Sequence, residues 1–353
     1  MIDDIFLPHI FLYSVFGSIV TLLYCQFYRP IFISLDIVAR SGGNSSHQGK
    51  VPLVGGLAIL SALVTIALLN GDEVLYDARL FFAVLPLWFV SLVDDKYPIS
   101  PFLRLGVQTI AVLVLMQTFD VDISYIGPGE GTRIYFGALT TPITLLFGLF
   151  IINAFNWVDG LDGLCATVSI VGLSLMFAVS GDQEQLLSIS LIFTLLGFLV
   201  LNFPYEYRAA YERRWGRFRC FLGDNGSASL GILFVVLMIV SSTKDEAYEL
   251  DISHTWYFIV IPIFDALHTI YYRVSKGKSP FFGDKDHLHH LLAEQFSRQS
   301  ILLRYLIVSS FFALLGFICI INNIGFYANV VLFSLSLIAF TITKNRYIKK
   351  YRT

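Results

Sequence analysis

The sequence predicts an all-α polytopic membrane protein, because of its composition, its series of apolar segments and its uneven distribution of basic residues. Of its 353 residues, 56% are hydrophobic and 14% are charged, and the mean hydropathy is +0.70. A soluble domain of this length carries more charge, since water must wet its surface. The composition therefore excludes an ordinary soluble protein. The formal net charge of −2 gives no reason to expect a nucleic-acid partner.

About eleven apolar segments are candidates for transmembrane helices, each of which needs roughly 17–25 residues. They lie near residues 6–28, 52–69, 79–93, 102–119, 139–156, 162–180, 185–203, 227–242, 255–272, 302–321 and 325–343. The first segment has no basic region before it, so we expect it to be retained rather than removed as a signal peptide. Residues 1–353 are expected to form a single integral-membrane domain that ends in a basic cytoplasmic tail, residues 344–353.

The turn residues Gly127-Pro128-Gly129 predict a short outer β-hairpin near residues 123–136. The basic residues predict the direction of the crossings, because Lys and Arg are enriched in cytoplasmic loops. With a periplasmic N-terminus and a cytoplasmic C-terminus, the outer side receives only Arg79, Arg133 and Lys244. The outer loops are acidic instead, which supports this orientation.

Unusual polar residues are concentrated in the cytoplasmic segments of this topology. These segments are residues 47–56, 94–108, 153–163, 221–227 and 276–290. Scattered structural polar groups would have no reason to favour one face, so the pattern indicates a single site at the cytoplasmic edge of the membrane. In the first segment, HQGKVPLVGG, Lys50 is either a binding residue or part of a region that packs membrane helices closely.

Asp94 and Asp95 end the third predicted helix. The helix dipole disfavours acidic residues at this end, although a simple interfacial position facing water is the alternative. Successive residues of a helix point about 100° apart, so the two carboxylates are expected to have different roles. On the next helix Arg104 and Gln108 share a face. Arg104 either belongs to the site or extends to the membrane surface.

The segment NAFNWVDGLDG, residues 153–163, is more specific. Asn153, Asn156 and Asp159 recur at three-residue steps, so they lie on one polar arc of a helix. The glycines that follow allow the backbone to approach a ligand closely. Asp162 either joins the site or caps the following helix.

Two further segments add an acid, a lysine and three histidines. In FLGDNGS, Asp224 opens the eighth predicted helix, where a metal-binding carboxylate and an ordinary helix cap both fit. In the last segment, Lys278 precedes His287, His289 and His290. A solvated helix end is the alternative, but with the neighbouring lysines, diphosphate or sugar contacts suit these histidines better than a zinc site does. Oxygen ligands dominate the whole set, which points to Mg²⁺ or Mn²⁺.

Taken in order, these motifs resemble the polyprenyl-phosphate N-acetylhexosamine-1-phosphate transferases, with the WecA-like branch closest and the MraY type more distant. The matching sequences are HQGKVPLVGG, DD followed by Arg104 and Gln108, NAFNWVDGLDGL, FLGDNGS and KGKSPFFGDKDHLHH. The resemblance implies a Mg²⁺- or Mn²⁺-dependent phosphotransferase of the bacterial inner membrane, with its active site at the cytoplasmic face. Such an enzyme transfers a sugar 1-phosphate, by default GlcNAc 1-phosphate, from a UDP-sugar to undecaprenyl phosphate and releases UMP. The lipid-linked product would initiate a cell-surface polysaccharide such as O-antigen, and the resemblance also suggests a homodimer.

The resemblance further implies roles for individual residues. Asn156 and Asp224 would be metal ligands, and Asp94, Asp95 and Asp159 would be catalytic. The implied substrate-binding residues are Lys50, Arg104, Asn153, Asp162, Lys278, His287, His289 and His290. A phosphate monoester has a second pKa of about 6, so much of the lipid phosphate is already dianionic at pH 7. We therefore expect Asp94 and Asp95 to position the nucleophile more than to create it.

Two other classes of protein share parts of this pattern. An ion-coupled transporter also has intramembrane acids and broken helices, but its sites lie near the middle of the membrane and often accompany repeats. A histidine-box metalloenzyme needs several histidine clusters, whereas this chain has one. The sequence leaves open the identity of the sugar, the polysaccharide pathway, the choice between a one-step and a covalent mechanism, and the oligomeric state.

Overall fold

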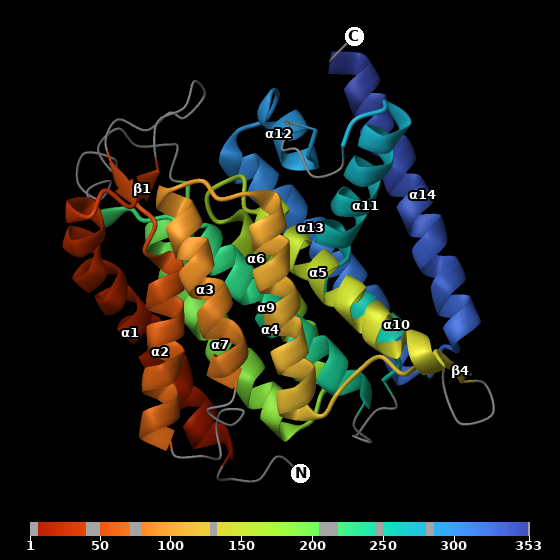
Figure 1. Ribbon diagram of the computed structural model, residues 1–353, viewed down its shortest axis with the longest axis horizontal. Coiled ribbons are helices and arrows are strands. Elements are labelled where there is room, and N and C mark those ends of the chain that lie inside the picture. Colours follow the sequence, from red (N-terminus) through yellow and green to blue (C-terminus); the bar gives the residue numbers. More distant parts are fainter. Residues whose placement is uncertain are drawn as a thin grey trace.

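The computed structural model describes residues 6–39, 50–70, 80–127, 133–204, 218–243, 250–279 and 286–351. They form a bundle of long helices with two small sheets (Figure 1). The helices are α1 (Phe6–Ser34), α2 (Gly55–Asn70), α3 (Leu80–Lys96), α4 (Pro101–Phe119), α5 (Thr140–Val158), α6 (Leu164–Val179), α7 (Asp182–Asn202), α9 (Asp224–Thr243), α10 (Ile252–Thr255), α11 (Val260–Ser275), α12 (Leu288–Ala293), α13 (Arg298–Ile321) and α14 (Phe326–Tyr351). Two 3-10 turns, η1 (Gly137–Leu139) and η3 (Trp256–Ile259), precede α5 and α11.

Every predicted membrane segment falls on helical structure, and the chain is a mostly helical, multi-pass membrane protein. Seven helical segments of the described residues are long and apolar enough to cross a membrane. They are Val15–Ser34, Pro101–Phe119, Gly137–Val158, Asp182–Asn202, Asp224–Thr243, Arg298–Ile321 and Phe326–Lys350. Shorter apolar helices occupy Gly55–Leu69 and Leu164–Val179, so the count of eleven crossings stays a prediction.

The predicted hairpin is present: β3 (Tyr125–Ile126) pairs antiparallel with β4 (Ile134–Tyr135). Residues 128–132, which contain most of its predicted turn, lie outside the described residues. The hairpin lies at the opposite end of the bundle from α12 (Figure 1). A second antiparallel pair, β1 (Val38–Ala39) with β2 (Val51–Pro52), was not predicted, because two-residue strands show no alternating pattern.

Some residues used in the sequence analysis lie outside the described part of the chain. They include His47, which opens HQGKVPLVGG, and the outer basic residues Arg79 and Lys244. Helix α14 continues to residue 351, so the segment expected as a basic tail is largely helical. Its final two residues are not described.

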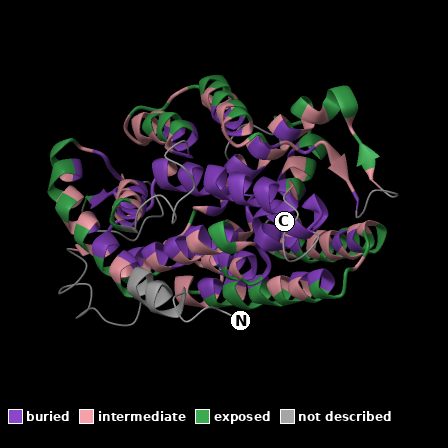
Figure 2. Cartoon of the chain, turned by 90° about the horizontal axis from the view of Figure 1, so that it is seen from below, coloured by how far each residue is buried: buried purple, intermediate pink, exposed green. Residues whose placement is uncertain are grey.

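Helix α9 forms the centre of the bundle. Its residues 225–242 are all buried, and Figure 2 shows the buried residues gathered in the middle of the molecule. By contrast, α14 exposes Leu335, Ile338 and Ile342 on the outside of the bundle. Exposed apolar side chains on an outer helix are what contact with lipid requires.

The ninth predicted segment is not one continuous helix, because α10, η3 and α11 follow one another within it. Pro262 has no backbone N–H, so it cannot donate to the carbonyl of Phe258 four residues earlier. That carbonyl packs against Gly172 of α6, where an added Cβ would overlap it. The break therefore lies where proline removes a helical hydrogen bond and glycine leaves space.

Candidate active site

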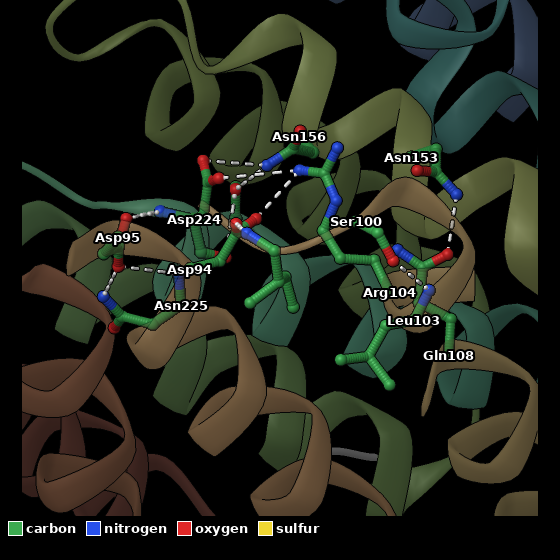
Figure 3. Close-up of polar contacts among 12 residues, drawn as sticks. Asp94, Asp95, Ser100, Leu103, Arg104, Gln108, Asn153, Asn156, Asp224 and Asn225 are labelled. Atoms are coloured by element: carbon green, nitrogen blue, oxygen red, sulfur yellow. Dashed lines mark hydrogen bonds and ion pairs between the residues drawn. The ribbon is translucent and has the colours of Figure 1, made fainter. Parts of the chain in front are cut away.

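Most of the predicted site residues meet at one end of the bundle, where α3 and α5 end and α4 and α9 begin (Figure 1). Figure 3 shows the side chains from these four helices pointing toward one another. Helix α12, which carries two of the histidines, lies at the same end (Figure 1). The clustering of polar residues expected from the sequence is therefore present.

Asp95 caps helix α9 from the end of α3. Its carboxylate accepts hydrogen bonds from the backbone N–H of Asp224 at 2.8 Å and of Asn225 at 3.3 Å, and from Asn225 Nδ2 at 2.6 Å. The first N–H groups of a helix have no partner within it, so an acceptor from another helix can replace the usual capping side chain. Gly223, at φ +78°, leaves room for this approach, since a Cβ there would lie 2.9 Å from Asp95 Oδ2. Asp95 thereby fixes the position of Asp224.

Asp94 has different partners, as the helical geometry predicts. Its Oδ1 accepts a hydrogen bond from the backbone N–H of Ile99 at 2.7 Å, and its Oδ2 lies 3.0 Å from Nη1 of Arg104. The same Nη1 lies 3.9 Å from Oδ2 of Asp224. The Arg104 side chain remains 36% exposed. A guanidinium that is held on one side and open on the other suits an anionic ligand.

The two asparagines of α5 connect it to different helices. Asn156 Nδ2 donates to Asp224 Oδ1 at 3.0 Å and to Ser227 Oγ at 3.3 Å, so its Oδ1 is the oxygen left for a ligand. One turn earlier, Asn153 Nδ2 donates to Gln108 Oε1 at 2.8 Å (Figure 3). Asn156 therefore belongs to the Asp224 cluster, whereas Asn153 joins α5 to α4.

Asp159 lies directly after α5, at its C-cap. Burial raises the pKa of its carboxyl group well above the ordinary value, and the negative charges of Asp224, Asp95 and Asp162 raise that pKa further. The acids of this region thus repel one another, which is the electrostatic condition that a bound cation relieves.

Asp162 forms ion pairs with two arginines. It pairs with Arg219 and, at 3.0 Å, with Arg298. Helix α6 begins after Gly163 with no side-chain cap, so Asp162 is not the cap of that helix. Its partners join the turn after α5 to the segment before α9 and to the start of α13.

The histidine segment packs on the turn after α5. The His287 ring centroid lies 5.6 Å from that of Trp157, and the rings of His287 and His289 stack at 5.9 Å. A Cβ at Gly160 would overlap Nε2 of His289. The two motifs that the sequence analysis places in one site are therefore in contact.

His289 is buried, and within the described residues neither ring nitrogen has a hydrogen-bond partner. Burial lowers the pKa of His289 well below its ordinary value, and the neighbouring His290 lowers that pKa further. The ring is therefore neutral at pH 7. The adjacent His290 lies 4.1 Å from it, centroid to centroid.

The two predicted lysines lie apart from the contacts of this cluster. Lys50 forms an exposed ion pair with Asp36 at 2.7 Å. Lys278 is exposed, three residues beyond the end of α11. Substrate binding by either lysine stays a prediction.

Several residues of the site escaped the sequence analysis. Asn225 and Arg219 flank the FLGD motif, but only their contacts with Asp95 and Asp162 reveal a role. Asp265 and Lys344 hold the histidine segment from behind. An ionisable residue within an apolar segment is a signal of function, and Asp265 in the predicted span 255–272 is such a signal.

The oxygen atoms present fit a Mg²⁺ or Mn²⁺ ion whose coordination shell is completed by substrate. Among the described residues, no three His, Cys, Asp or Glu side chains form a group that could hold a metal ion. Asp224 and Asn156 nevertheless offer two adjacent oxygen ligands. Mg²⁺ is usually bound by one or two carboxylates together with substrate phosphates and water. The donor set therefore fits such an ion but not an all-protein metal site.

The comparison with protein families agrees with this geometry. The model of glycosyl transferase family 4 matches residues 78–242, which contain Asp94, Asp95, Arg104, Asn156 and Asp224. Over these residues the chain is similar to glycosyl transferase family 4. The predicted family resemblance is thereby confirmed.

Three curated relatives of this chain share one description, undecaprenyl-phosphate alpha-N-acetylglucosaminyl 1-phosphate transferase. The relative from Yersinia pestis is 29% identical over 89% of this chain and 85% of its own length. The relative from Haemophilus influenzae Rd is 29% identical over 81% of this chain and 80% of its own length. The relative from Escherichia coli K12 is 29% identical over 77% of this chain and 73% of its own length.

Proposed function

We propose that this protein transfers GlcNAc 1-phosphate from UDP-GlcNAc to undecaprenyl phosphate. An oxygen of the lipid phosphate attacks the phosphorus attached to the sugar, the bond from that phosphorus to the UMP oxygen breaks, and UMP leaves. The observation that carries the proposal is the Asp224 cluster, capped by Asp95 and flanked by Arg104, at the end of the bundle that also holds the histidines. The shared description of the relatives supports it.

The proposed chemistry depends mainly on positioning and charge, as in other phosphoryl transfers. Arg104 is held by Asp94, lies near Asp224 and remains partly exposed, so it can bind the donor diphosphate. Asp224 and Asn156 would hold a Mg²⁺ or Mn²⁺ ion. When bound, that ion would offset negative charge on the diphosphate and on the departing UMP.

Asp95 acts in this proposal through Asp224. Both of its carboxylate oxygens accept hydrogen bonds from N–H groups of α9, which is the bonding pattern of a helix-capping group. The lipid phosphate does not need a base, since it is largely dianionic at neutral pH. The contacts therefore favour direct attack with both carboxylates as positioning groups.

In the proposed topology the site faces the cytoplasm of a bacterium, at the inner membrane, where UDP-sugars are made. The acceptor phosphate is anchored at the membrane surface by its polyprenyl chain. The cluster lies at helix ends rather than midway along them, which suits a reaction between a lipid headgroup and a soluble nucleotide sugar.

The test is UMP release by the purified protein with undecaprenyl phosphate, Mg²⁺ and a panel of UDP-sugars. We expect UMP and a lipid-linked sugar with UDP-GlcNAc, and neither product after chelation of the metal with EDTA. UDP-GalNAc and UDP-glucose report the choice of sugar. A protein that releases no UMP with any donor, as a transporter would behave, contradicts the proposal.

A further inference from the structure

Behind the histidine segment, α11, α12 and α14 share a buried ion pair. Asp265 of α11 and Lys344 of α14 are both almost fully buried, and Lys344 Nζ lies 2.7 Å from Asp265 Oδ1. Lys344 also donates to Thr269 Oγ1 at 2.9 Å. The same Oδ1 of Asp265 accepts a hydrogen bond from the backbone N–H of Leu288 at 2.9 Å. The ammonium is thus fixed to α11, and the carboxylate is fixed to the start of α12.

The second oxygen of Asp265 orients a histidine. Its Oδ2 lies 2.8 Å from Nδ1 of His287. An ionised carboxylate can only accept hydrogen bonds, so Nδ1 carries a proton. The bond made by one ring nitrogen determines the state of the other. Nε2 of His287 is therefore the atom left for a ligand, on a ring that packs beside Trp157.

Stability is a poor explanation for this arrangement. Burial of two charges carries a desolvation cost that their attraction only roughly offsets, and apolar side chains of similar size often serve as well. The pair instead fixes the relative positions of α11, α12 and α14. Next to it, His268 Nε2 lies 3.0 Å from Asn345 Oδ1, so two successive residues of α14 fix that helix to α11.

We propose that Asp265 and Lys344 are positioning residues that present Nε2 of His287 to the nucleotide-sugar donor. This inference rests on the proposed function and adds to it a role for the last helix of the bundle. Helix α12 lies at the end of the bundle (Figure 1), where a soluble donor arrives, whereas a polyprenyl chain stays among the membrane helices. Loss of the Asp265–Lys344 pair should therefore lower kcat/KM for the donor and leave the KM for polyprenyl phosphate unchanged.

Two double variants without the ion pair test whether a hydrogen-bond acceptor at position 265 orients His287. The Asp265→Leu/Lys344→Met variant removes both charges and the acceptor for Nδ1. The Asp265→Asn/Lys344→Met variant also removes both charges but keeps an oxygen that can accept from Nδ1. Each double variant removes both members of the pair, so neither is left buried without the other, which is the main cause of misfolding in single variants. Arg346→Met, an exposed basic residue on the same helix, is the matched control.

The readouts are the thermal unfolding temperature and kcat/KM for UDP-GlcNAc, per folded protein in detergent. We expect the leucine-containing variant to lose roughly 10–100-fold in kcat/KM, as when a carboxylate that orients a histidine is removed. The asparagine-containing variant should recover most of this loss, and the control should match the wild type. Equal kcat/KM for the two double variants would overturn the inference. Wild-type protein that releases no UMP would instead overturn the proposed function, so the two failures are distinguishable.

Discussion

Asp94 and Asp95 are adjacent in the chain but hold different helices. Asp94 orients Arg104 of α4, and Asp95 caps α9 at Asp224. Their helical spacing predicts that the roles differ. It cannot predict the capping partner, because Asp224 lies 129 residues further along the chain and only the packing of α3 on α9 brings the two together.

The capping contact predicts how an Asp95→Asn variant behaves. Its amide oxygen can still accept from the backbone N–H of Asp224, but its NH₂ group faces the Nδ2 donor of Asn225. We expect the rate of UMP release to fall roughly 10–100-fold, the usual effect of losing a group that orients a metal ligand. Raising the pH should not restore the rate, since no proton transfer is lost.

Initial rates from pH 6 to pH 9 test this prediction, with Asp182→Asn as the control. Asp182 is an exposed acid in the first turn of α7, so its variant should keep wild-type rates. Full recovery of the Asp95→Asn rate at high pH would identify Asp95 as a general base and contradict the capping role.

At the scale of elements, contact between the turn after α5 and the histidine segment requires glycine at position 160. A Cβ there would overlap the His289 ring, so Gly160→Ala must displace α12 or the turn. We expect a loss of about 1–3 kcal/mol in stability, typical of overpacking, and a loss of UMP release. Adding His289→Ala should restore the thermal unfolding temperature, because the ring that the methyl group meets is gone.

Gly106→Ala is the matched control, since a Cβ at Gly106 of α4 meets nothing within 4 Å. Alanine is also the better helix former, so this variant should unfold at or above the wild-type temperature. If Gly160→Ala unfolds at the wild-type temperature and retains activity, the contact seen here does not constrain the site.

The sequence pattern predicted helices better than it predicted their interruptions. Apolar length alone places α4 and α7 within a few residues of their observed ends. The break before α11 was not predicted, because Pro262 lies in an otherwise apolar segment. The effect of its missing N–H also depends on the space left by Gly172. The role of Asp265 escaped for a related reason: its partners come from α12 and α14, which no local pattern connects.

For the whole molecule, the class and the gathering of polar residues at one end could be predicted from composition and loop position. The number of crossings could not, because α2 and α6 are shorter than the clear candidates and length alone does not decide their path. The direction of the crossings also stays a prediction, since it rests on loop charges rather than on contacts.

Labelling of single introduced cysteines tests that direction. The native cysteines, Cys25, Cys165, Cys220 and Cys319, are all buried, so their background reaction should be low. A membrane-impermeant maleimide added to intact spheroplasts should modify Tyr135→Cys in the exposed strand β4. It should modify Arg346→Cys at the end of α14 only after the membrane is opened. The reverse pattern would place the Asp224 cluster on the outer face.

The enclosure of α9 has a consequence for how the protein tolerates different membranes. A mismatch between helix length and bilayer thickness acts on helices that touch lipid, which respond by tilting. Outer helices such as α14 take up that adjustment, whereas α9 is shielded by its neighbours. The depth of Asp224 is consequently set by protein packing, and the reacting groups keep their height when the surrounding lipid becomes thicker or thinner.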